Sequence, residues 1–154
     1  MKSYALSHLP VEVDYKKISH ETILPFEFIQ KAHHPFTGAV VLFSGEVRSN
    51  STKEVDYLEY EVHETLAENV ISGIIADAKQ KWDLPIALCV HRAGKVQVCE
   101  SAVIVITASK HRKEAYEANQ YIIHRVKHEA PIWKREFFKD GTSEWGHNCS
   151  CSTS

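Results

Sequence analysis

The chain has 154 residues, of which 44% are hydrophobic and 25% charged, a composition ordinary for one soluble globular domain. No apolar run approaches the ~20 residues that a membrane-spanning helix needs, and residues 1–8 lack the apolar segment of a signal peptide, so we expect no membrane association and a cytoplasmic location. The net charge of −2 is unevenly distributed: residues 1–80 carry 7 basic and 12 acidic residues, residues 81–154 carry 11 and 8. A local basic region on a near-neutral chain favours a small anionic ligand or an acidic partner segment over nucleic acid.

The first half of the chain predicts strands around a short helix. The expected elements are a possible strand over Tyr4–Leu9, a helix over Leu24–Ala32, an apolar strand over Gly38–Arg48 and a second strand over Val55–His63. Gly45 interrupts the apolar strand, and a glycine inside a strand often marks a bulge or a close approach to the backbone.

A longer helix follows, from Thr65 to Trp82, with Thr65 and Glu68 in capping-box spacing. Its expected buried stripe comprises Leu66, Val70, Ile74, Ala78 and Trp82. Three strands come next, over Ile86–His91, Lys95–Val98 and Ala102–Ala108. The last is the most apolar and is expected at the centre of its sheet.

A second long helix is predicted between Ser109, a favourable N-cap, and Pro131, which ends the helical pattern. A closing strand is expected over Ile132–Phe138. This order of elements predicts an α+β fold with helices packed on a mostly antiparallel sheet. We expect a single catalytic domain over residues 1–145 and a flexible tail over residues 146–154.

The start of this second helix is basic, because its expected first turn contains Lys110, His111, Arg112 and Lys113. A helix N-terminus disfavours cations by roughly 0.3–1 kcal/mol each, and a bound phosphate would reverse that penalty. The turn is therefore either an anion site or a solvated basic segment, and the residues alone leave both open.

Arg112 and Lys127 cannot serve one small ligand from the same straight helix. They are fifteen residues apart, which separates them by roughly 22 Å along the axis. Either they have different functions, or a second copy of the chain supplies one of them. We therefore predict a homodimer with a shared site.

Lys127 is the best candidate for catalysis, because it lies in the last helical turn before Pro131 and Trp133, which we expect to shield it from water. A partly desolvated lysine near other cations can act as a nucleophile or a proton donor. The alternative is a solvated lysine at a helix C-terminus. Lys134 alternates with Trp133, so one of them points inward; an exposed strand lysine is the alternative.

Other candidate sites have weaker support. His91 and Arg92 precede a turn and are either structural or face a partner. His147, Cys149 and Cys151 offer three possible ligands where a structural zinc site needs four, so we expect no metal. Cys89 and Cys99 lie in strand-like stretches, and a cytosolic chain of this size needs no disulfide.

Four stretches resemble the large, catalytic subunit family of molybdopterin synthase. They are Gly38–Arg48, Val90–Gly94, Ser109–Arg112 and Lys127–Glu136, and the resemblance covers roughly residues 36–138. The most specific of them is the Ala-Pro-Ile-Trp-Lys-Arg-Glu run, with a lysine four residues before its proline.

The resemblance implies an α/β-hammerhead fold and a homodimer flanked by two small ubiquitin-like subunits, together a heterotetramer. The implied reaction is a sulfur transfer in molybdenum cofactor biosynthesis. It moves sulfur from a thiocarboxylate on the C-terminal Gly-Gly of the small subunit to cyclic pyranopterin monophosphate, and forms the dithiolene of molybdopterin. The chain itself would bind no cofactor.

The resemblance also implies which residues contact the substrate. They are Glu46, Val47, Arg48, His111, Arg112, Lys127, Lys134, Arg135 and Glu136. Lys127 and Lys134 would be catalytic, His111 and Arg112 would hold the substrate phosphate, and Glu46, where some relatives have lysine, would contribute through its backbone at most. The alternative function is a non-catalytic, anion-binding homodimer that docks a ubiquitin-like tail.

Overall fold

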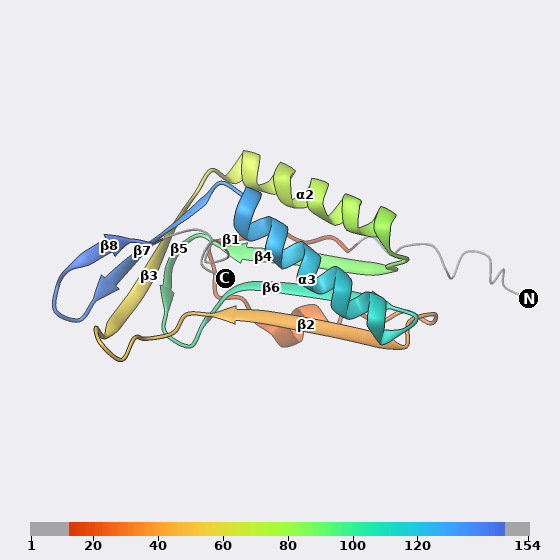
Figure 1. The fold of residues 1–154 in the computed structure, drawn as a ribbon, viewed down its shortest axis with the longest axis horizontal. Coiled ribbons are helices and arrows are strands. Elements are labelled where there is room, and N and C mark those ends of the chain that lie inside the picture. Colours follow the sequence, from red (N-terminus) through yellow and green to blue (C-terminus); the bar gives the residue numbers. More distant parts are fainter. Residues whose placement is uncertain (1–12, 147–154) are drawn as a thin grey trace, which may run out of the picture.

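A computed structural model describes residues 13–146, which form two four-stranded sheets and three helices (Figure 1). The elements are β1 (Ile18–Ser19), α1 (Pro25–Ile29), β2 (Ala39–Glu46), β3 (Val55–Val62), α2 (Glu64–Lys81), β4 (Ile86–Arg92), β5 (Gly94–Gln97), β6 (Ser101–Ser109), α3 (Arg112–Glu129), β7 (Ile132–Phe138) and β8 (Ser143–Trp145). The predicted α+β class is confirmed, and every strand pair except β1–β4 is antiparallel. No helix in this part of the chain is long and apolar enough to cross a membrane.

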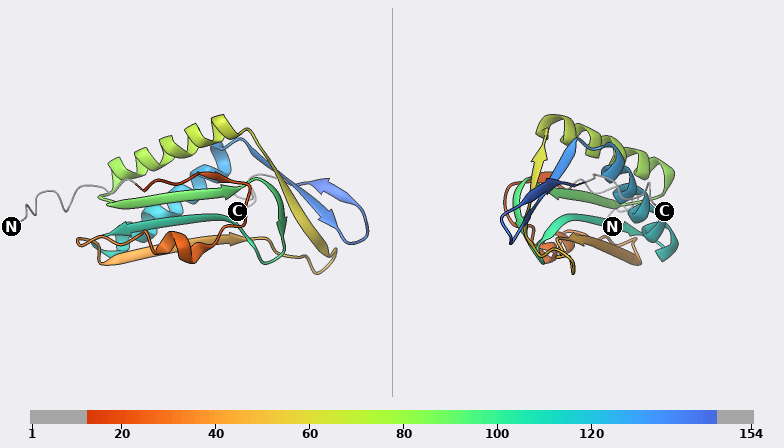
Figure 2. Two further views of the ribbon diagram at one scale, coloured as in Figure 1. Left: turned by 180° about the vertical axis from the view of Figure 1, so that it is seen from behind. Right: turned by 60° about the vertical axis from the view of Figure 1, so that its left-hand side comes forward.

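The larger sheet has the strand order β1-β4-β6-β2, so the most apolar strand lies inside the sheet, as predicted. All nine residues of β6 are buried. Helices α2 and α3 cover one face and α1 lies on the other (Figure 2). Burial on both faces explains why β4 and β6 are almost continuously apolar rather than alternating.

The smaller sheet, β5-β3-β7-β8, stands at one end of the larger one, and its strands cross the direction of β4 and β6 (Figure 1). Its inner face contributes a small apolar cluster of Val55, Leu58, Val96 and Phe138 with Val47 and Ala102. The register between β3 and β7 pairs Tyr60 with Lys134. This junction of the two sheets is where the candidate site lies.

Both long helices begin at residues other than those predicted. Helix α3 starts at Arg112, and the Ser109 hydroxyl donates to the His111 carbonyl instead of capping the helix, so Lys110 and His111 precede the first turn. Helix α2 starts at Glu64, because the His63 ring Nδ1 accepts a hydrogen bond from the Leu66 amide at 3.3 Å. Both predicted N-caps, Ser109 and Thr65, are therefore wrong.

The buried stripe of α2 was also misplaced. Leu66 is 47% exposed, and Val70 and Trp82 are only partly buried, whereas Ile74 and Ala78 are buried as expected. The remaining buried positions are Ala67, Ile71 and Ile75. Helix α2 packs on both the sheet and α3. Because of this double contact, the buried face is shifted by about one residue from the predicted stripe.

Three sequence predictions lie outside the described residues: the strand over Tyr4–Leu9, the tail beyond Gly146, and the metal-ligand candidates His147, Cys149 and Cys151 within that tail. Strand β8 was not predicted. It pairs with β7 after the Asp140–Gly141 turn, where Gly141 has a φ of 88° that favours glycine. Gly146 continues along β7 by donating its amide hydrogen to the Lys134 carbonyl at 2.8 Å.

Candidate functional site: a cation-lined pocket between the two sheets

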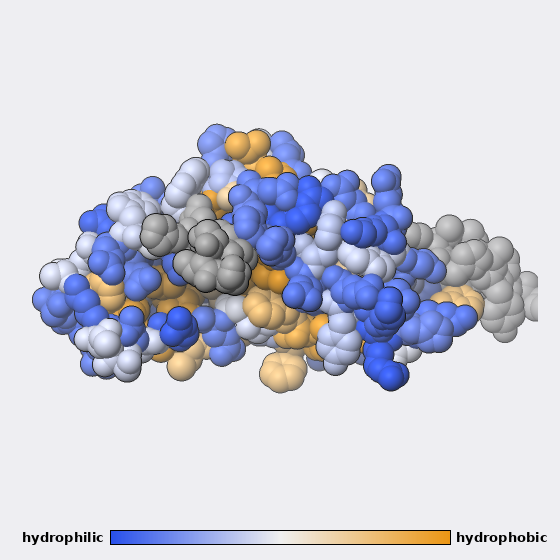
Figure 3. All heavy atoms as spheres, viewed as in Figure 1, coloured by the Kyte–Doolittle hydropathy of each residue, from blue (hydrophilic) through white to orange (hydrophobic). Residues whose placement is uncertain are grey.

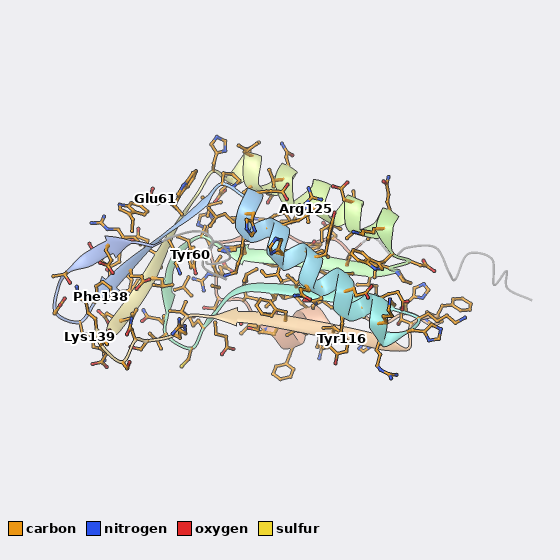
Figure 4. The ribbon with its side chains drawn as sticks, viewed as in Figure 1. Tyr60, Glu61, Tyr116, Arg125, Phe138 and Lys139 are labelled. Atoms are coloured by element: carbon orange, nitrogen blue, oxygen red, sulfur yellow. The ribbon has the colours of Figure 1, made fainter. Side chains whose placement is uncertain are left out.

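A pocket of about 320 Å³ lies where the smaller sheet meets the end of the larger one. Its walls come from the end of β2 and the segment that follows it, the inner face of β3 and β7, and the last turn of α3. Tyr60, labelled in Figure 4, lies at this junction between the sheets, whereas the next residue, Glu61, is exposed. Six of the nine predicted site residues line this pocket: Glu46, Val47, Arg48, Lys127, Lys134 and Glu136.

The segment after β2 is positioned by backbone hydrogen bonds. The register with β6 shifts between Gly45 and Glu46, which is the irregularity that the glycine predicted. Val47 then donates its amide hydrogen to the Glu100 carbonyl at 3.0 Å and accepts from the Cys99 amide at 2.7 Å. With Val47 buried and held on both sides, the chain leads Arg48 to the pocket wall with an exposed side chain.

Helix α3 brings Lys127 to the pocket from its last turn. The buried Asn119 fixes the helix, because its Nδ2 donates to the carbonyls of Val41 and Val105 at 3.1 and 3.0 Å. Lys127 is exposed in the single chain, so the expected shielding by Pro131 and Trp133 is wrong. Trp133 lies on the opposite face of β7 from the pocket, with 47% of its surface exposed.

Strand alternation decides which residues of β7 enter the pocket. Lys134 and Glu136 line it, whereas Arg135 faces the other side, where its guanidinium donates to the Ser143 hydroxyl at 2.9 Å. The Arg135 guanidinium also lies over the Phe137 and Trp145 rings, at 5.1 and 5.6 Å. The predicted role of Arg135 in substrate contact stays a prediction, and its place in the structure is outside the pocket.

His91 also lines the pocket, and the sequence left its role open. Its side chain is buried, and its ring packs edge-on against Tyr60 at 4.9 Å between centroids. The Nδ1–H must donate to the Arg92 carbonyl at 2.7 Å, because a carbonyl only accepts, which leaves Nε2 as an acceptor. Burial lowers the pKa of His91 to about 4, an effect that the nearby Lys127 charge adds to and the hydrogen bond to Arg92 opposes. His91 is thus a neutral imidazole in a pocket of charged groups.

Tyr60 is a second pocket residue that the sequence did not single out. Burial, assisted by the Glu136 carboxylate, raises the pKa of its phenol to about 12, so it stays protonated and can donate. The available signal was the alternation of β3, which placed Tyr60 on the same face as Leu58. That pattern predicts an inward side chain but cannot tell a core tyrosine from one at a pocket wall.

The charged groups of the pocket favour an anionic ligand. Arg48, Lys127 and Lys134 supply three cations, and Glu46 and Glu136 supply two carboxylates. With His91 neutral, the lining has a small positive excess. Such a site can hold an anion while keeping donors and acceptors close together for proton transfer.

His111 and Arg112 lie away from this pocket, at the other end of α3 from Lys127. Both are exposed, and the neighbouring Lys113 forms an ion pair with Glu117 at 3.0 Å. The helix is continuous from Arg112 to Glu129 (Figure 1), so the predicted separation of the two cation groups holds within one chain.

The face that carries α3 is mostly hydrophilic, with apolar surface showing over the first turns of α2 (Figure 3). Within residues 13–146, no three or more His, Cys, Asp or Glu side chains gather in a way that could hold a metal ion. The two cysteines described, Cys89 and Cys99, are both free.

Fold and site together define a small α+β domain with a pocket lined by three cationic and two anionic side chains. The family model described as MoaE protein matches residues 18–129. The chain belongs to this family. It is 38% identical over 132 residues to the molybdopterin synthase catalytic subunit of Staphylococcus aureus (strain COL), covering 85% of this chain and 89% of that protein. It is also 38% identical over 139 residues to the protein of that name from Bos taurus, covering 90% of this chain and 74% of the relative.

Solved structures agree with these relatives. The crystal structure of molybdopterin synthase from Staphylococcus aureus superimposes with a TM-score of 0.80 at 36% identity, covering 88% of this chain and 98% of that one. A complex of subunits 1 and 2 of the molybdopterin-converting factor from Helicobacter pylori shares the fold, with a TM-score of 0.72 at 24% identity. The family resemblance seen in the sequence is therefore confirmed.

Proposed function

We propose that this chain transfers sulfur from the thiocarboxylated C-terminus of a small ubiquitin-like subunit to cyclic pyranopterin monophosphate, forming the dithiolene of molybdopterin. The chain is an enzyme of the molybdopterin synthase catalytic subunit family, and its relatives bear that name. The observation that carries the proposal is the pocket itself. It brings Arg48, from the segment after β2, together with Lys127 at the end of α3 and Lys134 of β7, which lie far from Arg48 in the sequence.

The charges of the pocket suit both reactants, because a cyclic phosphate and a thiocarboxylate are each anionic. Lys127 is placed to donate a proton or to stabilise negative charge that develops at the reacting carbons, and Lys134 to orient the pterin or assist proton transfer. The sulfur arrives on the partner and the pterin on the substrate, so the proposal requires no cofactor bound by the chain. The free thiols of Cys89 and Cys99 support the cytoplasm, a reducing compartment, as the place of action.

We further propose that His111 and Arg112 act in the pocket of a second copy. Lys127 and Arg112 occupy opposite ends of one 18-residue helix, roughly 22 Å apart along its axis, which is too far for one substrate. In a two-fold dimer each pocket would receive the basic start of the neighbouring α3, and that segment would supply the phosphate contacts. A heterotetramer with two small subunits follows if each pocket takes one C-terminal tail.

Reconstitution tests the reaction and the role of Lys127. The chain is incubated with a thiocarboxylated small subunit and cyclic pyranopterin monophosphate, and dithiolene product is quantified. We expect product from the wild type, and a loss of roughly 100-fold or more in Lys127→Ala if Lys127 acts as the general acid. Lys81→Ala, which removes an exposed lysine of α2, is the control and should retain full activity. A wild type that binds the small subunit yet forms no product would favour the non-catalytic anion-binding dimer.

Complementation with the same Lys127→Ala chain tests the shared site. Two differently tagged inactive chains, Lys127→Ala and Arg112→Ala, are co-expressed and assayed together. In a shared-site dimer each mixed dimer has one intact pocket, so a random mixture should regain about a quarter of wild-type activity. If each site is built from one chain, every pocket carries a defect, and no activity returns.

A further inference from the structure

We propose that Gly146 is a positioning residue for Lys134: by having no side chain, it provides the space across which the lysine stem reaches the pocket. The inference rests on the proposed function, since it gives Lys134 a role in the reaction. Gly146 follows β8, and no pattern in the sequence connected it to the site.

The two residues are held together by their backbones and packed together by the lysine side chain. The Gly146 amide donates to the Lys134 carbonyl at 2.8 Å. A Cβ placed on Gly146 would lie 2.6 Å from Lys134 Cε, 3.0 Å from Cγ and 3.3 Å from Cδ. Three carbons of the lysine stem therefore run directly over the glycine, so a side chain at position 146 would displace the stem.

The backbone conformation does not explain this glycine. The described glycines with a positive φ are Gly94 and Gly141, so Gly146 has a conformation open to other residues. The lysine stem is what a Cβ at position 146 would meet. The absence of a side chain at position 146 therefore matters for the lysine stem that lies over it.

The opposite side of Lys134 is already occupied. Tyr60 is its direct partner across β3 and β7, and side chains at such paired positions contact one another. The Tyr60 ring is partly buried and packs edge-on against His91, so it cannot readily move aside. Lys134 therefore extends between a fixed aromatic ring and a bare backbone.

A methyl group at position 146 would change the position of the Lys134 ammonium group more than the stability of the fold. The atoms in its way belong to the flexible part of a lysine, which can rotate to another conformer at little cost to folding. The ammonium group would then lie elsewhere in the pocket. Misplacing a catalytic or orienting group by about 1 Å can lower the rate as much as 100-fold.

The experiment compares Gly146→Ala and Gly146→Val with the wild type in the reconstituted reaction, measuring kcat and KM, and follows thermal unfolding of each. Gly73→Ala is the matched control, because a Cβ there meets nothing within 4 Å. Substrate affinity is measured by calorimetry with cyclic pyranopterin monophosphate in wild-type and Lys134→Ala backgrounds.

We expect kcat/KM of Gly146→Ala to fall roughly 10- to 100-fold, and that of Gly146→Val to fall further. The melting temperature of Gly146→Ala should stay within about 2 °C of the wild type. In the Lys134→Ala background, Gly146→Ala should change neither affinity nor stability, because the atoms it displaces are gone. Gly73→Ala should leave kcat/KM unchanged.

Equal kcat/KM for Gly146→Ala and an active wild type would overturn the inference and leave the proposed function standing. The inference would also be overturned if Gly146→Ala lowered the stability or the affinity of the Lys134→Ala chain as much as it lowers that of the wild type. The glycine would then serve the backbone and not the lysine. An inactive wild type would refute the proposed function, and the inference would fall with it.

Discussion

The buried His91 should make the protein acid-sensitive. Burial penalises the charged ring and lowers the pKa of its imidazole from the ordinary value of 6.5 to about 4 in the folded chain. The folded state therefore binds fewer protons than the unfolded state. The stability that His91 contributes is present above pH 6.5 and is lost as the pH falls towards 4. At 1.36 kcal/mol per pH unit, the whole difference is about 3 kcal/mol, of which about 2 kcal/mol is lost between pH 7 and pH 5.

His91→Asn isolates this effect. An asparagine amide can replace the Nδ1–H donor to the Arg92 carbonyl but does not titrate. We would measure the free energy of unfolding by urea at pH 7 and pH 5, at one protein concentration, for both chains. The wild type should lose about 2 kcal/mol more than the variant, since the other nine histidines are present in both. Parallel losses would refute the assignment of His91 as a buried neutral group.

Two further substitutions test how the site is supported. Asn119→Ala should lower the free energy of unfolding by about 1–3 kcal/mol, because it removes the hydrogen bonds from α3 to the Val41 and Val105 carbonyls; a change below about 0.5 kcal/mol by urea unfolding would contradict that role. Cys99→Gly should raise stability by up to about 1 kcal/mol, because Cys99 has a φ of 75°. A lower melting temperature for Cys99→Gly would show that this exposed side chain stabilises the turn that holds Val47.

Helix starts show why local pattern was an incomplete guide to this fold. Ser109 has the chemistry of an N-cap, but it is the last residue of β6, and its hydroxyl donates to the His111 carbonyl. His63 is a weaker N-cap by type, yet its ring accepts from the Leu66 amide. Where a strand ends is set by its neighbours in the sheet, and that decided where each helix begins.

The pocket likewise depends partly on local pattern and partly on tertiary packing. Alternation predicted that either Trp133 or Lys134 points inward, and the β3–β7 register decided for Lys134. Neither composition nor spacing could associate His91 or Gly146 with that lysine, because His91 lines the same pocket from another strand, and Gly146 meets the lysine stem only once β8 pairs with β7. The predicted roles of the site residues stay predictions until the reconstituted reaction is measured.

The sequence by itself determined the α+β class, the strands β6 and β7 and the family, because apolar periodicity and a specific motif are properties of contiguous residues. It also determined that Arg112 and Lys127 are separated, since helical rise depends on residue number alone. Only the tertiary structure decided that Arg48, Lys127 and Lys134 share one pocket, that His91 is neutral there, and that Gly146 makes room for the lysine. Burial and contact between distant residues depend on the packing of the two sheets against each other, which no local pattern specifies.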